Sequence, residues 1–216
     1  MVLELDSISF SYEKNNILNG LDLVVNTGDF VIIKGPSGIG KTTLLNIIGL
    51  IEDVDQGIIR IEDTEITNDN RNNYKKSFSY LFQNPVLINH LTVNENIYLY
   101  GKWWGQNDEF ILEQREELIE RVGLSHLSHQ LPIYLSNGER QRIALLSCLI
   151  CSPKILLLDE PLGSVDSKNK NKFIEELDNL VVGKITTICV THSNSFDELS
   201  NKIYFLEKGK LMSDKS

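Results

Sequence analysis

A short glycine-rich segment has the composition and the spacing of a phosphate-binding loop. It consists of Gly35, Pro36, Ser37, Gly38, Ile39, Gly40, Lys41 and Thr42, with Thr43 next in the chain. Glycines let the backbone turn tightly, so that several N–H groups converge on phosphate oxygens. The lysine supplies positive charge to the β- and γ-phosphates, and the Thr42 hydroxyl is a hard oxygen ligand for Mg²⁺. The segment therefore predicts nucleotide binding.

Two adjacent carboxylates follow an apolar run in the second half of the chain. Ile155–Leu158 is continuous and apolar, which is typical of a strand buried on both faces. Asp159 would lie near the Mg²⁺ shell, and Glu160 near the γ-phosphate as a candidate general base. The alternative is an ordinary junction between a strand and a loop, because apolar strands often end in acidic residues.

The hydrophobic patterns around these motifs predict the elements that position them. Apolar and polar residues alternate over much of 3–25, which indicates antiparallel strands. Phe30–Ile33 is another continuous apolar run, and it leads directly into the glycine-rich segment. We expect a helix from Thr43 to about Ile51, followed by a short strand over Ile58–Ile61.

The middle of the chain changes to a helical period, from Asn94 to about Cys151. Ser136 and Glu139 have the spacing of a capping box, which predicts that a helix begins at Ser136. Strand patterns return afterwards, with Thr187–Val190 as a third buried strand and a closing hairpin. The order is strands, phosphate loop, helical insert and strands, which predicts an α/β core with an inserted helical unit.

The composition narrows the possible classes of protein. The chain has 216 residues, 30 Asp and Glu against 21 Lys and Arg, and a net charge of −9. This length is typical of one domain, and the acidic balance argues against nucleic acid as a partner. The apolar runs are too short to span a bilayer, and the first residues do not resemble a signal peptide. Three cysteines, an odd number, suit a reducing compartment. We therefore expect a cytoplasmic protein.

Further motifs occur in an order that resembles the ATP-binding cassette (ABC) ATPases. They are Leu135-Ser136-Asn137-Gly138-Glu139, similar to the LSGGQ signature; Asp159-Glu160-Pro161, similar to Walker B; Asp166 in the D-loop; Gln83 in the Q-loop; Thr191-His192, similar to the switch histidine; and Tyr12, where the family places an aromatic residue on adenine. The resemblance covers essentially the whole chain. It is far more specific than any single motif.

The resemblance implies a fold and a division of the chain. The fold class would be α/β, a P-loop NTPase (RecA-like) core with an antiparallel β subdomain and an inserted α-helical subdomain. Residues 1–216 would form a single ABC ATPase domain. Residues 1–84 and 153–216 would make the catalytic core with its β subdomain, and residues 85–152 the helical subdomain that carries the signature motif.

The resemblance also implies a mechanism in a head-to-tail homodimer with ATP and Mg²⁺. The residues implied in catalysis are Lys41, Gln83, Glu160 and His192. The residues implied at Mg²⁺ are Thr42, Gln83 and Asp159. The signature residues implied at the partner's ATP are Ser136, Asn137, Gly138 and Glu139. In this arrangement Glu160 would polarise the attacking water, and His192 would contact the γ-phosphate.

Four departures from the family pattern leave the rate of hydrolysis open. Asn137 replaces the first glycine of the signature, and Asn tolerates a left-handed backbone better than most residues. Glu139 replaces a glutamine, and Ser147 occupies a position where the family often has arginine. The D-loop over 161–166 also differs from the usual sequence.

The segment after the Q-loop suggests a branch of the family. Leu91–Val93 and Glu95–Ile97 resemble bacterial cassettes of lipoprotein release, macrolide or peptide export, and bacteriocin immunity. This resemblance implies an ATPase subunit that powers a separate membrane permease, of export type, from the inner face of the membrane. Two alternatives stay open: a regulatory ATPase of the cell-division type that transports nothing, and a nucleotide-binding module too slow to cycle.

Two side-chain clusters have competing interpretations. Tyr98, Tyr100, Trp103 and Trp104 either pack within the helical subdomain or, with Pro85–Leu91, line a groove for the permease. Cys148 and Cys151 have C-x-x-C spacing but lack a second pair of ligands. We expect them to be buried structural thiols.

Overall fold

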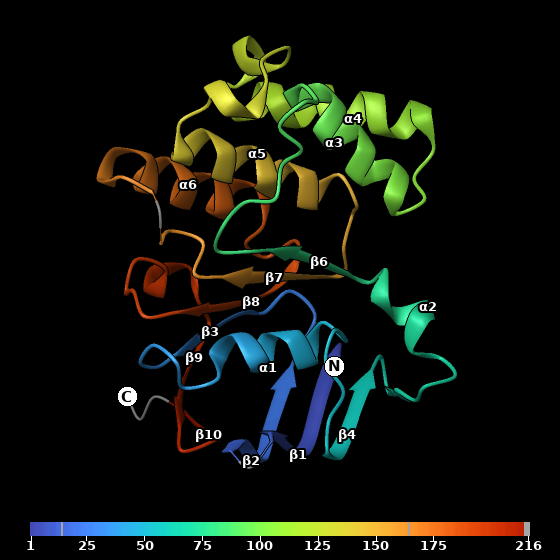
Figure 1. Cartoon of the computed structure of the whole chain (residues 1–216), viewed down its shortest axis with the longest axis vertical. Coiled ribbons are helices and arrows are strands. Elements are labelled where there is room, and N and C mark those ends of the chain that lie inside the picture. Colours follow the sequence, from blue (N-terminus) through green and yellow to red (C-terminus); the bar gives the residue numbers. More distant parts are fainter. Residues whose placement is uncertain (14, 164, 214–216) are drawn as a thin grey trace.

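A computed structural model of the chain describes residues 1–13, 15–163 and 165–213, which form two sheets and two layers of helices (Figure 1). The smaller sheet is antiparallel, with the order β2-β1-β4-β5. Its strands are β1 Leu3–Tyr12, β2 Asn15–Val25, β4 Gln56–Ile61 and β5 Thr64–Glu65. The pairing of β1 with β2 contains β-bulges between residues 5 and 11. They account for a shift of one residue in the apolar alternation, from Leu3 and Leu5 to Ile8 and Phe10.

The larger sheet has the order β10-β9-β3-β8-β7-β6. Its strands are β3 Phe30–Lys34, β6 Phe78–Leu81, β7 Ile155–Asp159, β8 Thr186–Thr191, β9 Lys202–Glu207 and β10 Lys210–Ser213. All its pairings are parallel except that of β9 with β10. The carboxyl ends of β3, β6, β7 and β8 therefore meet at one edge, where ligands bind in sheets of this kind.

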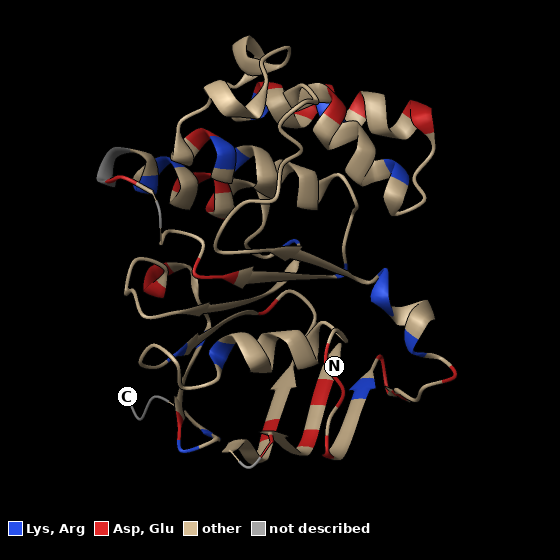
Figure 2. Cartoon of the chain, viewed as in Figure 1, with Lys and Arg blue, Asp and Glu red and all other residues tan. Residues whose placement is uncertain are grey.

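Helices cover both faces of the larger sheet. The described helices are α1 Lys41–Ile48, α2 Arg71–Lys75, α3 Val93–Trp103, α4 Asp108–Arg121, α5 Asn137–Leu149 and α6 Ser167–Leu180, with three short 3₁₀ helices. The layer of α3, α4, α5 and α6 lies on one side of this sheet, and α1 with the smaller sheet lies on the other (Figure 1). The acidic face of α4 is exposed on the outside of its layer (Figure 2).

Strand alternation divides the core into two clusters. Phe30 and Ile32 belong to the cluster under the helical layer, and Val31 and Ile33 belong to the cluster around α1 and the smaller sheet. All four side chains are buried, because β3 has parallel neighbours on both sides and helices or strands on both faces.

The α/β class, the buried strands and the closing hairpin are confirmed. The predicted ends of the first helix are wrong, because α1 begins at Lys41 and ends at Ile48. It stops at this point because Leu50 has a left-handed backbone with φ of 58°. The short elements α2 and β5 were not predicted. The division into 1–84 with 153–216 and 85–152 stays a prediction.

Within the described part of the chain, no helix is both long and apolar enough to cross a membrane. Cys148, Cys151 and Cys189 are free and buried. Burial raises the pKa of Cys151 to about 12, which fits an inert structural thiol rather than a reactive one.

Candidate nucleotide-binding and hydrolysis site

The glycine-rich segment connects the end of β3 to the first residue of α1, as the phosphate-binding mechanism requires. Gly38 and Gly40 have positive φ angles of 78° and 108°. A Cβ atom on Gly40 would lie 2.5 Å from the Ile17 side chain. This position therefore needs glycine both for its conformation and for the close approach of β2. The loop places the N-terminus of α1 at the edge of the sheet, where backbone amides attract an anion.

The ammonium group of Lys41 is buried at the centre of this loop. Its Nζ donates hydrogen bonds to the carbonyl oxygens of Gly35 at 2.8 Å and Pro36 at 3.2 Å. It also lies 3.5 Å from Oε1 of Glu160. A cation is thus held between the phosphate loop and the carboxylate that follows β7. Both motifs identified in the sequence belong to one site.

Thr42 and Asp159 meet although they are far apart in the chain. The Thr42 hydroxyl donates to Oδ2 of Asp159 over 3.0 Å. Burial raises the pKa of the Asp159 carboxyl, and the Thr42 hydrogen bond only partly offsets this. A hydroxyl beside a carboxylate is the hard oxygen pair that suits Mg²⁺, so these residues fit the ion. Among the described residues no group of three His, Cys, Asp or Glu could hold a metal. A Mg²⁺ ion bound through one carboxylate usually takes substrate phosphate oxygens and water as its other ligands.

Glu160 is held in position from both of its oxygens. Oε1 lies 3.0 Å from Nδ1 of His192, and Oε2 accepts from the Thr191 hydroxyl at 3.0 Å and the His192 amide at 3.4 Å. Burial raises the pKa of Glu160, but the hydrogen bonds of His192 and Thr191 outweigh it and lower the net pKa. The carboxylate is therefore anionic at neutral pH. Its backbone φ of 43° is unusual for a residue other than glycine, and such strain is concentrated at functional sites.

Thr191 is a residue of this site whose role the sequence did not reveal. It ends β8, the strand between β3 and β7, so its hydroxyl reaches Glu160 directly. The available signal was a polar residue at the end of a buried strand, next to a histidine. That signal does not say which carboxylate the hydroxyl meets, because strand order decides it.

Gln83 and the D-loop meet beside the two carboxylates. A Cβ atom on Gly163 would lie 3.2 Å from Nε2 of Gln83 and 3.3 Å from the Glu160 carbonyl oxygen. Gln83 is exposed, and its role at Mg²⁺ stays a prediction. Asp166 accepts hydrogen bonds from the amide and the side chain of Asn169, at 3.2 and 2.6 Å. These bonds stabilise the start of α6.

Tyr12 lies at the hairpin between β1 and β2 and is 46% exposed. Its ring packs edge-on against Phe10, and its hydroxyl is 3.4 Å from Glu52. Ile17, on β2 of the same hairpin, lies against Gly40 of the phosphate loop. Stacking of Tyr12 on adenine stays a prediction.

The signature segment forms the predicted capping box at the start of α5. Oγ of Ser136 accepts from the Glu139 amide at 3.3 Å, and the Ser136 amide donates to Glu139 at 2.8 Å. Asn137 is the first helical residue of α5 and has no positive φ. The left-handed backbone considered for it is therefore wrong. A Cβ atom on Gly138 would lie 2.6 Å from Asn169, which accounts for glycine at this position.

The structure separates the signature segment from the phosphate loop of the same chain. The helix α5 lies in the helical layer, and α1 lies on the opposite face of the larger sheet (Figure 1). Ser147, the other departure on α5, is buried, and its hydroxyl donates to the Ile143 carbonyl oxygen at 3.0 Å. Serine is thus satisfied there within its own helix.

Comparison with known proteins identifies the family. Residues 18–163 match the family model described as ABC transporter. The chain belongs to this family. It is an ABC ATPase cassette, and its fold, its ATP-binding motifs and their order agree with that class.

The similar proteins include transport ATP-binding proteins and dimeric cassettes. The spermidine/putrescine import ATP-binding protein PotA of Haemophilus influenzae is 37% identical over all of this chain, which spans only 58% of PotA. The arginine transport ATP-binding protein ArtM of Bacillus subtilis is 31% identical, over 99% of this chain and 90% of its own. The dimeric ATP-binding cassette MJ0796, bound to ADP and Pi, matches with a TM-score of 0.85 and 27% identity, over 99% of this chain and 98% of its own.

Proposed function

We propose that this ABC ATPase cassette binds and hydrolyses ATP as the subunit that powers a separate membrane permease. The observation that supports this most strongly is the convergence of Lys41, Thr42, Asp159, Glu160 and His192 at one edge of the sheet. Phosphoryl transfer depends mainly on positioning and on electrostatic stabilisation. This edge supplies a cation, a hydroxyl, two carboxylates and an imidazole, which can position the reactants and stabilise the developing charge.

Each residue has a task that follows from its position. The glycine-rich loop and Lys41 would bind the phosphates, and the anionic Glu160 would orient the attacking water and draw its proton. Thr191 and His192 would keep Glu160 in place, with His192 close enough to share contact with the γ-phosphate. Thr42 and Asp159, with Gln83 nearby, would hold Mg²⁺. When bound, Mg²⁺ supplies charge stabilisation at the phosphates.

A head-to-tail homodimer would complete the site. Within one chain, α5 lies on the other side of the sheet from α1 (Figure 1). The phosphate loop would therefore meet the signature helix of a second copy and not its own. The dimeric state of the MJ0796 cassette supports this arrangement. Ser136, Asn137, Gly138 and Glu139 would then face the partner's γ-phosphate, with Asp166 at the interface.

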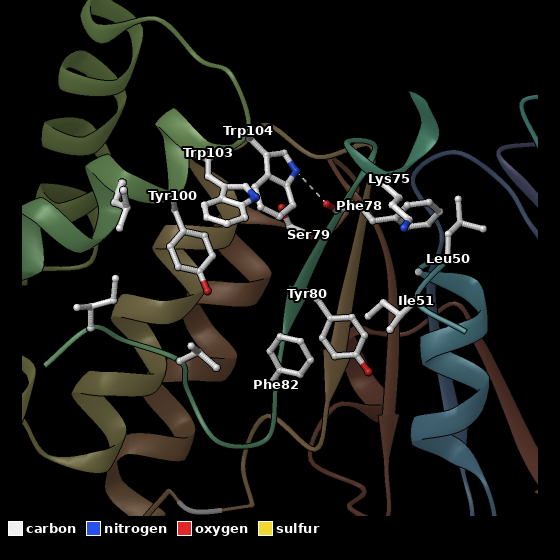
Figure 3. A pocket seen from close by; sticks show the side chains of 14 residues that line it. Leu50, Ile51, Lys75, Phe78, Ser79, Tyr80, Phe82, Tyr100, Trp103 and Trp104 are labelled. Carbon is white, nitrogen blue, oxygen red and sulfur yellow. Dashed lines mark hydrogen bonds between the residues drawn. The ribbon is translucent and has the colours of Figure 1, made fainter. Parts of the chain in front are cut away.

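An apolar groove is the proposed docking site for the permease. It encloses about 600 Å³ between the end of α1, strand β6 and helix α3, and is lined by apolar side chains with Lys75 at one side (Figure 3). Tyr100 and Trp104 stack on each other, and Trp104 donates to the Phe78 carbonyl oxygen at 3.1 Å. These two rings mainly pack within the protein. Trp103 is 76% exposed, so it is the aromatic residue that a helix of the permease would contact.

The groove proposal has a matched test in binding to the cognate permease. Trp103→Ala should weaken that binding at least about tenfold, in the range of an aromatic hot spot, and leave unfolding unchanged. Met212→Ala removes an exposed apolar side chain outside the groove and should change neither. Equal binding by all three proteins would contradict the proposal.

The direction of transport and the cargo belong to the permease. The names of PotA and ArtM refer to import and to arginine transport, and they do not support the export type that residues 91–97 predict. Export therefore stays a prediction of that segment, as does attachment to the inner face of the membrane. Movement of a substrate that stops on Lys41→Ala would establish transport and its direction. A permease-dependent phenotype without any transported substrate would favour the regulatory alternative.

The test of the proposed activity is ATP turnover with and without the Glu160 carboxylate. Glu160→Gln should abolish measurable turnover while ATP binding is kept, and the variant should form an ATP-dependent dimer. Substitution of Glu198, an exposed glutamate outside the site, by glutamine is the control and should leave turnover unchanged. A wild-type chain that does not hydrolyse ATP even beside its permease would support the slow-binding alternative instead.

A further inference from the structure

A buried lysine stands immediately before the phosphate loop. Lys34 is the last residue of β3, and its side chain is only 10% exposed. Its Nζ donates to Oδ1 of Asn194 at 2.8 Å and to Oδ2 of Asp197 at 2.7 Å. Both partners come from the segment that follows His192. Lys34 therefore joins the strand that carries the phosphate loop to the segment that carries the histidine.

The position of Lys34 is one where an apolar side chain would be expected. Phe30 and Ile32, on the same face of β3, belong to the core under the helical layer. Burial of the Lys34 ammonium group carries a desolvation cost, although the Asp197 side chain is 34% exposed. Replacement of a buried ion pair by packed apolar residues is often neutral or stabilising. The other oxygen of Asp197 is buried without a hydrogen-bond partner among the described residues. Stabilisation of the fold therefore does not account for the presence of the Lys34–Asp197 ion pair.

The segment after His192 has few other attachments to the sheet. It turns on itself, since the Ser193 amide donates to the Thr191 hydroxyl at 3.0 Å and the Ser195 amide to the Ser193 hydroxyl at 3.1 Å. Phe196 is fully buried and anchors the turn by apolar contact. The contacts of Lys34 add a directional tie to the polar side of this turn.

We propose that Lys34 is a positioning residue for hydrolysis. It sets the place of His192, and through it of Glu160, relative to the phosphate loop, by holding Asn194 and Asp197. This inference rests on the proposed roles of His192 and Glu160. It adds a coupling between the phosphate loop and the segment that follows β8, which would both contact the γ-phosphate.

The first test measures ATP turnover by the full chain. Lys34→Met keeps the length of the side chain but removes its charge, and it should lower kcat about tenfold, the size expected for lost charged hydrogen bonds. The KM for ATP should change less than about twofold, because the contacts of the phosphate loop are kept. Lys34→Arg retains a donor and should keep at least about half of kcat. An unchanged kcat in Lys34→Met would overturn the proposal.

A second ion pair of the larger sheet is the matched control. Lys202 of β9 pairs with Asp29, just before β3, at 2.6 Å, at the opposite end from the phosphate loop. Lys202→Met should affect stability about as much as Lys34→Met but leave kcat unchanged. Equal losses of kcat in the two variants would reduce Lys34 to a merely structural residue.

A readout without nucleotide separates positioning from chemistry. Hydrogen exchange of the amides over 193–199 should become about tenfold faster in Lys34→Met and stay unchanged in Lys202→Met, since exchange reports local opening. If Lys34→Met does not fold, the isosteric Asp197→Asn takes its place in both measurements. No change in exchange in this segment would contradict the proposed tie.

A double variant tests whether Lys34 acts through the histidine. In a His192→Ala background, Lys34→Met should cause no further loss of turnover, because coupled residues are non-additive. A full additional tenfold loss would overturn this route. A different result would contradict the proposed function itself, namely ATP turnover that persists in Glu160→Gln. If Glu160→Gln is inactive and Lys34→Met is fully active, only the inference about Lys34 is wrong.

Discussion

Two helices of the helical layer begin with nearly the same capping box. In α3, the Thr92 amide and hydroxyl donate to Glu95 at 2.7 and 2.8 Å, and the Glu95 amide donates back at 3.3 Å. In α5, the corresponding distances between Ser136 and Glu139 are 2.8, 2.7 and 3.3 Å. Local geometry therefore does not distinguish the two helix starts.

The difference lies in the next two amides. In α3, the Val93 and Asn94 amides donate to the carbonyl oxygens of Gln130 and Ser128, both at 3.0 Å. In α5, the amides of Asn137 and Gly138 have no hydrogen-bond partner within the described residues. Amides that already donate to carbonyl oxygens of the same chain fix the helix in the fold and cannot bind a ligand. Amides at a helix start without such partners attract an anion. Of these two starts, only that of α5 is suited to a partner's phosphate.

The largest expected effect comes from the second helical residue of each helix. Gly138→Ala places a methyl group 2.6 Å from Asn169 and should displace the free amides. We expect about a 100-fold loss of ATP turnover, as for the loss of preorganised donors. Asn94→Ala at the matched position of α3 should leave turnover unchanged. Urea unfolding of both variants must show that each is folded, and comparable turnover in the two would refute the distinction.

The capping residues themselves should separate stability from activity. Ser136→Ala and Thr92→Ala each remove one cap, so each should cost about 1 kcal/mol in the free energy of unfolding. Only Ser136→Ala should also lower turnover, by about tenfold, because its hydroxyl stands at the proposed nucleotide interface. Steady-state assays beside chemical denaturation test both. A tenfold loss in Thr92→Ala would mean that the caps act only through stability.

Acid should weaken both helix starts in the same direction. Hydrogen bonds from Thr92 lower the pKa of Glu95. Burial raises the pKa of Glu139, but the hydrogen bonds from Ser136 outweigh it, and the net pKa is lowered. A lowered folded pKa gives stabilisation that is complete above the ordinary value of 4.5 and decreases as the pH falls through the folded value. Urea unfolding between about pH 6 and pH 3 should show a smaller acid slope in Glu95→Gln and in Glu139→Gln. An unchanged slope would contradict the role of these carboxylates.

The smallest effect is expected at the first helical residue of α5. Asn137 is exposed and has an ordinary helical backbone. Asn137→Gly, which restores the usual family residue, should therefore change turnover by less than about twofold and cost about 0.5 kcal/mol from helix propensity. A strong rise in turnover would show that the Asn137 side chain obstructs the partner's phosphate and that hydrolysis is slow for this reason.

Much of the site was predictable because it rests on local patterns. Glycine spacing predicted the loop before α1, continuous apolar runs predicted β3, β7 and β8, and the spacing of Ser136 and Glu139 predicted the start of α5. These signals depend on backbone conformation and side-chain period within one segment, which a sequence carries directly. The motif order also sufficed to indicate the family.

The contacts between segments were decided by the tertiary structure. Thr42 meets Asp159 across 117 residues. Thr191 reaches Glu160 because β8 lies next to β7 in the sheet. The sequence shows Lys34 as an unusual charge in an apolar strand, but only the fold supplies Asn194 and Asp197. In the same way, the two capping boxes are equivalent in sequence. Only carbonyl oxygens brought from residues 128 and 130 distinguish them, because a hydrogen bond depends on which distant groups the packing places within reach.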